Sequence, residues 1–183
     1  MSNMTLVIII VAAVVIVAAL VAFFVSRGRR AQQERQERAR AAYGPEYERT
    51  VQERGSEREA EKELRERRER LEDEVQPLSK ESRKRYEERW LGVERTFVDD
   101  PWASLEEADR VVADILAERN FPTDSRQEAS KGIGVMHPQV VEDFREAQRV
   151  HREATDSEGE AELEEMRRAI QMYRSVYERL TGG

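Results

Sequence analysis

The chain contains one long apolar run, residues 6–25, LVIIIVAAVVIVAALVAFFV, with no charged side chain in twenty positions. A helix rises about 1.5 Å per residue, so this run would extend about 30 Å, the thickness of the hydrocarbon core of a bilayer. The remainder of the 183 residues is polar, and charged residues make up 38 % of the chain. The sequence therefore predicts one transmembrane helix, residues 6–25, joined to a single polar domain.

The residues beside the apolar run predict its orientation. Arg27, Arg29 and Arg30 follow the run, whereas residues 1–5, MSNMT, contain no lysine or arginine. Basic residues that flank a span remain on the cytoplasmic side. We therefore expect a single-pass protein of the plasma membrane with residues 1–5 outside and the C-terminal domain in the cytoplasm. A cleaved signal peptide is the alternative, and the length of the run and its neutral N-terminal flank disfavour it.

Residues 26–77 are expected to form a charged helical linker next to the membrane. Gly44-Pro45 and Pro77 interrupt its helix-forming sequence. Within it, residues 57–75 carry only a thin apolar stripe of about two heptads, which fits either a coiled coil or a helix on one side of a domain.

Residues 78–181 show the spacing of a small all-α bundle, with apolar positions three and four apart and no alternation typical of strands. Two examples of such faces are Tyr86, Trp90, Val93 and Phe97 in one helix, and Leu163, Met166, Ile170, Tyr173, Tyr177 and Leu180 in the last.

Capping signals mark several expected helix ends. A serine three residues before a glutamate predicts a helix start at Ser56 and another at Ser104. Asp99-Asp100 before a proline is typical of a helix stop and a cap. Residues 123–134 are less regular, since DSRQEAS favours a helix and KGIG weakens it.

The composition and the motifs argue against several classes of function. After Val75 the chain has 17 basic and 24 acidic residues, which is unfavourable for binding to nucleic acid. The absence of cysteine excludes disulfides and cysteine-based zinc sites. There is no H-E-x-x-H motif, and KGIG lacks the spacing of a phosphate-binding loop. We therefore expect no cofactor, no metal and no enzymatic activity.

Four residues would be the catalytic candidates if the protein were an enzyme: Asp99, Asp100, His137 and His151. Their positions at helix ends and on an apolar face are more typical of caps and packed side chains. Trp102, directly after Pro101, is a candidate contact for a partner protein, with packing against the domain as the alternative.

Several segments resemble a family of small actinobacterial single-pass membrane proteins to which no activity is assigned. They are YGPEYERTV, PLS, FVDDP, EADRVV, NFP, the HP dipeptide and MYRSVYERL, which together cover most of residues 43–180. The resemblance implies one N-terminal span and a C-terminal helical part. It implies no reaction, cofactor or catalytic residue.

The sequence thus favours a membrane-anchored, non-catalytic interaction or scaffold protein that presents an acidic helical domain at the cytoplasmic face. Its expected partners are the lipid bilayer and either a protein or a second copy of the chain, without nucleic acid or a small-molecule substrate. The alternative is a structural stalk or coiled-coil component of a membrane complex, similar in layout to the b-type stator subunit of ATP synthase or to division proteins.

Overall fold

A computed structural model describes residues 23, 33–156 and 162–182 of the chain. Apart from Phe23, the apolar run 6–25 lies outside the described residues, and so do Arg27, Arg29 and Arg30. Among the helices in the described part, none combines the length and apolar character that a membrane crossing requires. The span and its orientation therefore stay predictions.

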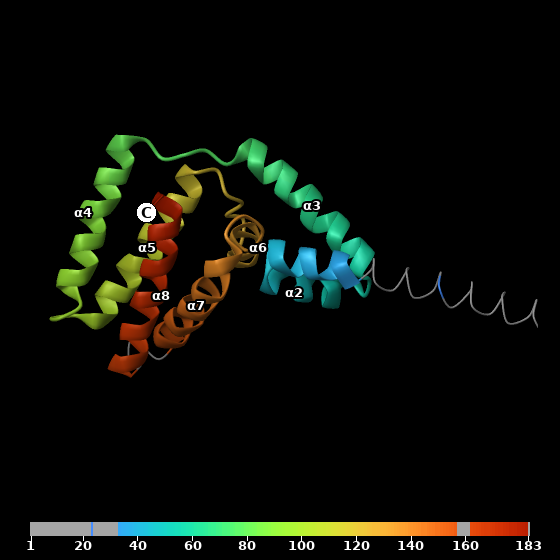
Figure 1. The fold of residues 1–183 in the computed structure, drawn as a ribbon. Coiled ribbons are helices and arrows are strands. Elements are labelled where there is room, and N and C mark those ends of the chain that lie inside the picture. The colour runs from blue at the N-terminus through green and yellow to red at the C-terminus, as the bar shows by residue number, and fades with distance from the viewer. Residues whose placement is uncertain (1–22, 24–32, 157–161, 183) are drawn as a thin grey trace, which may run out of the picture. The chain divides into compact units, whose positions relative to one another are not determined.

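The chain divides into two compact units, Met1–Ala41 and Ala42–Gly183. In the first unit, residues 33–41 are helical. All regular structure in the described part of the second unit is also helical, which confirms the all-α prediction (Figure 1). Its elements are α2 Pro45–Arg54, α3 Glu57–Glu74, α4 Lys80–Thr96, α5 Pro101–Glu118, α6 Arg126–Met136, the 3-10 helix η1 Pro138–Val140, α7 Val141–Asp156 and α8 Leu163–Thr181.

The main core of the second unit lies between α4, α5, α7 and α8. Helix α8 packs against both α5 and α7, and α4 packs against α5. Helix α5 supplies an almost continuous apolar face, in which Leu105, Val111 and Ile115 are fully buried. Isolated helices of this length are only marginally stable in water, so the mutual burial of their apolar faces stabilises the unit.

A second group of helices extends this unit toward its N-terminus. Helix α3 packs against α2 and α6, and its apolar stripe, Ala60, Leu64 and Leu71, is buried. Tyr47 of α2 is also almost fully buried. The compact unit therefore begins at Ala42, earlier than the expected boundary at residue 78, because the thin stripe of residues 57–75 is covered by other helices of the same chain.

The helix ends agree with most of the capping signals. The Ser56 side chain accepts a hydrogen bond from the Glu59 amide (3.5 Å), and Asp100 accepts one from the Ala103 amide (2.9 Å). The predicted start at Ser104 is wrong, because Asp100 and Pro101 already begin α5. Ser104 is instead buried, and its hydroxyl donates to the carbonyl of Val93 (2.8 Å).

Helix α6 runs without a break through the KGIG segment. Gly134 faces Glu46 of α2, and a Cβ atom at Gly134 would lie 2.9 Å from Glu46 Oε2. The glycine therefore lets α2 and α6 approach closely.

Candidate functional site

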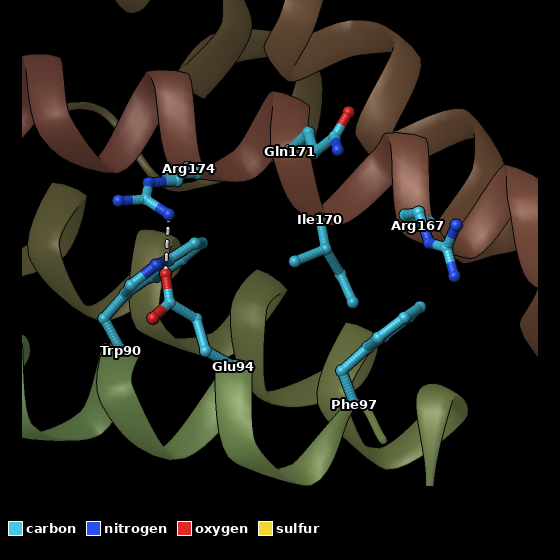
Figure 2. Close-up of a pocket in the computed structure, with 7 residues that line it drawn as sticks. All are labelled: Trp90, Glu94, Phe97, Arg167, Ile170, Gln171 and Arg174. Atoms are coloured by element: carbon cyan, nitrogen blue, oxygen red, sulfur yellow. Dashed lines mark hydrogen bonds and ion pairs between the residues drawn. The ribbon is translucent and has the colours of Figure 1, made fainter. Parts of the chain in front are cut away.

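The described part of the chain has an apolar groove between α4 and α8, with a cavity of about 240 Å³ (Figure 2). We call it the α4–α8 groove. Its lining residues are Trp90, Glu94, Phe97, Arg167, Ile170, Gln171 and Arg174.

The groove follows from the way in which the two helices are supported. Both α4 and α8 pack against α5, which holds them beside each other without close packing along their length. Trp90, Glu94 and Phe97 are four and three residues apart, so they lie on one face of α4. From the opposite side, Ile170 of α8 points toward Phe97 (Figure 2). The result is an apolar floor that opens to solvent.

Trp90 is the most buried residue of the groove lining. It is only 4 % exposed, and its ring stacks on Tyr177 with centroids 4.7 Å apart and an interplanar angle of 14°. The indole Nε1–H has no hydrogen-bond acceptor among the residues that the structure describes. A buried donor without an acceptor costs about 1–3 kcal/mol.

Charged side chains lie along the rim of the groove. Arg174 donates to Glu94 across the groove (2.8 Å) and to Glu178 along α8 (2.9 Å). The hydrogen bond to Glu178 and the charge of Glu94 raise the pKa of Arg174, so it stays a cation. The Arg167 guanidinium lies 5.8 Å from the centre of the Phe97 ring. The α8 side of the rim is therefore cationic, and the α4 side carries one carboxylate.

Trp102 lies outside the groove lining. It is partly buried in the first turn of α5 and stacks on His151 of α7, with ring centroids 5.6 Å apart. Burial lowers the pKa of His151 below its ordinary value. The two sequence candidates are thus brought together as a packed aromatic pair, and the role of Trp102 as a partner contact stays a prediction.

The other catalytic candidates are held by separate elements. The Asp100 carboxylate is the cap of α5. His137 follows the last residue of α6, where its Nδ1 accepts a hydrogen bond from Arg179 (3.3 Å) and its ring centroid lies 6.1 Å from that of Phe121. Burial and the nearby charges of Arg119 and Arg179 lower the pKa of His137 to about 4. Within residues 33–156 and 162–182, no three acidic or histidine side chains are grouped as metal ligands would be.

Sequence reasoning placed Phe97 and Ile170 on apolar faces without recognising a groove. Helical periodicity identifies the apolar side of each helix, but it does not show whether a neighbouring helix covers that side. The signal was Arg167 and Arg174, which flank Ile170 at helical spacing and mark an edge between apolar and solvated surface.

Comparison of the chain with protein-family models, curated proteins and solved structures found no match in any of the three. The resemblance to actinobacterial single-pass membrane proteins therefore stays a prediction.

Proposed function

We propose that the protein is a membrane-anchored, non-catalytic interaction protein of the plasma membrane. The apolar run 6–25 anchors it, with the helical unit on the cytoplasmic side, and the α4–α8 groove binds an amphipathic helix of a partner protein. The observation that carries the proposal is the open apolar groove between α4 and α8, which is lined by Trp90, Phe97 and Ile170.

The shape and the chemistry of the groove fit a helix better than an extended peptide. Amphipathic helices bind by placing apolar side chains, one turn apart, into a groove between two helices. The groove presents Trp90, Phe97 and Ile170 along the direction of α4 and α8. Two exposed apolar residues lie close to the groove residues in the sequence, since Val98 follows Phe97 and Leu163 lies one turn before Arg167.

The rim charges specify the partner further. Arg167 lies exposed on the α8 side and forms a surface ion pair with Glu164 (3.4 Å), which an acidic residue at that edge of the partner helix could replace. The proposed partner is therefore an amphipathic helix with an apolar stripe and an acidic edge.

A photo-crosslinking residue placed at the exposed Gln171 tests this proposal in cells that express the full chain. The control places the same residue at Arg70, which is exposed on α3 and outside the groove. We expect an adduct from position 171 only, with a crosslinked peptide that has the stated apolar and acidic pattern.

Two substitutions then test whether the groove itself is responsible. Arg167→Glu reverses a charge at an exposed position, and Ile170→Asp places a charge in the apolar floor. Both should reduce the adduct strongly, with a circular-dichroism melt to verify that each variant is folded. An adduct that persists in both folded variants, or a crosslinked peptide without the pattern, would contradict the proposal.

A structural stalk has less support. A stalk would need residues 57–75 to pair with another chain, but Ala60, Leu64 and Leu71 of that segment are already buried within the unit.

A further inference from the structure

A second groove, with a volume of about 390 Å³, is lined by side chains of α2, α6 and α7. We call it the α2–α6–α7 groove. None of its lining residues belongs to the α4–α8 groove. They are Arg49, Glu53, Arg126, Gln127, Ser130, Lys131, Glu142, Arg145, Glu146, Gln148, Arg149 and Arg152.

The lining of this groove is basic in a chain whose net charge is −7. Three carboxylates line it, Glu53, Glu142 and Glu146, against six cations. Five of the cations are arginines, whose planar guanidinium groups donate several hydrogen bonds in a fixed geometry. Such a concentration of guanidinium groups around one cavity favours an anion with several oxygen atoms.

Two of these cations are not neutralised within the described structure. Lys131 pairs with Glu128 (3.3 Å), Arg126 pairs with Asp109 (3.2 Å), and Arg145 and Arg149 also have carboxylate partners. Arg49 of α2 and Arg152 of α7, in contrast, form no ion pair with any residue that the structure describes. Both are exposed, so they can close on a bound anion without disturbing the core.

The side-chain amide of Gln148 in the same groove has no hydrogen-bond partner among the described residues. Gln148 as a whole is 8 % exposed and lines the groove. The amide atoms of Gln148 are not among the enclosed polar atoms without a partner in the described structure, so they stay accessible and can contact a ligand in the groove.

The start of α6 adds to the positive potential. Ser125 caps this helix through the Glu128 amide (3.1 Å), and Arg126 and Gln127 of its first turn line the groove. The first turn of a helix has amide groups without intrahelical partners and carries a partial positive charge, which favours phosphate.

We propose that the α2–α6–α7 groove binds a phosphate group, with Arg49 and Arg152 as its principal charge contacts and Gln148 as a hydrogen-bonding contact. A tetrahedral phosphate presents oxygens in several directions, toward α2, α6 and α7 together, whereas a planar carboxylate presents only two. The phosphate comes either from a soluble phosphorylated compound or from the head group of a membrane lipid.

Isothermal titration of the full chain in a non-ionic detergent distinguishes these two sources. The probes are inorganic pyrophosphate and glycerophosphoglycerol, the soluble head group of phosphatidylglycerol. Preference for pyrophosphate would identify a soluble ligand, and preference for glycerophosphoglycerol would identify a lipid. No saturable binding of either probe at millimolar concentration would overturn the proposal.

Variants of the exposed arginines show whether binding occurs in this groove. Arg49→Gln combined with Arg152→Gln should weaken binding about tenfold or more. Arg70→Gln is the matched control, because Arg70 is also exposed and lies outside the groove, and it should change affinity less than twofold. If the double variant and Arg70→Gln weaken the binding of the probe equally, the attraction is non-specific and the proposal is overturned.

Gln148→Met provides a second readout. Because the amide forms no hydrogen bond in the described structure, its removal should leave the melting temperature unchanged or raised. Binding of the preferred probe should nevertheless fall several-fold. If Gln148→Met binds the probe as tightly as the parent protein does, Gln148 does not contact the ligand.

Discussion

Gly134 and Gly92 both lie inside helices, but only Gly134 is tightly packed against another side chain. A Cβ atom at Gly134 would lie 2.9 Å from the Glu46 carboxylate, whereas one at Gly92 would have no atom within 4 Å. Glu46 is 1 % exposed and paired with Arg145, so it cannot move away easily. The need for glycine in KGIG is thus a consequence of packing.

The two alanine variants should therefore change stability in opposite directions. We expect Gly92→Ala to raise the free energy of unfolding by about 0.5–1 kcal/mol through helix propensity. Gly134→Ala should lower it by about 1–3 kcal/mol through overpacking. Urea unfolding of the full chain in detergent measures both, and a stabilised Gly134→Ala would show that α2 does not pack closely on α6.

His137 predicts a pH dependence of stability. Its pKa in the folded protein is about 4, whereas an unfolded histidine has a pKa of about 6.5. Between these values the unfolded chain binds a proton that the folded protein does not bind, so stability falls as the pH is lowered from 6.5 to 4. The effect should be about 1–2 kcal/mol between pH 7 and pH 5, reduced from its full value because the ring is only partly buried.

The variant His137→Gln isolates this contribution. The parent should lose about 1–2 kcal/mol more than the variant between pH 7 and pH 5 in urea unfolding. His151, whose pKa is also lowered, is present in both proteins and cancels in the comparison. Equal pH profiles for the two proteins would show that His137 titrates normally in the folded state.

At the scale of elements, helix α2 depends on one buried ion pair. Glu46 of α2 pairs with Arg145 of α7, and Arg145 also donates to Ser130 of α6 (2.7 Å). The pair therefore links three helices. Removal of one partner from a buried pair leaves an uncompensated charge, which costs more than removal of both.

Arg145→Met should lower the free energy of unfolding by about 3–5 kcal/mol. Hydrogen exchange should become fastest in α2, which loses its charge partner. Glu46→Gln combined with Arg145→Met should recover a large part of the stability. If the double variant is as unstable as the single one, Arg145 acts through packing of its aliphatic stem instead.

The sequence was sufficient to predict the helices of the main core, because faces such as Tyr86, Trp90 and Val93 repeat at helical spacing. It was not sufficient for α6, whose glycines lower helix propensity and are explained only by packing: Gly134 lies against Glu46 of α2, and Gly132 lies against Phe121 and Pro122. It also did not reveal the two grooves. The α2–α6–α7 groove joins residues from Arg49 to Arg152, and local patterns do not report contacts so distant in sequence.

For the whole molecule, the earlier start of the compact unit changes how the predicted anchor is connected. The unit begins at Ala42, so the sequence between the apolar run 6–25 and the folded helices is shorter than the expected linker 26–77. Gly44 ends the preceding helix with a φ of 53°, a conformation that favours glycine.

Cysteine labelling in intact cells tests the membrane-anchored arrangement most directly. The chain contains no cysteine, so Ser2→Cys and Arg70→Cys each introduce a single reactive thiol. We predict that a membrane-impermeant maleimide labels Ser2→Cys in intact cells and labels Arg70→Cys only after the cells are permeabilised, with both variants in the membrane fraction. Labelling of Arg70→Cys from outside, or recovery of the chain in the soluble fraction, would contradict the account.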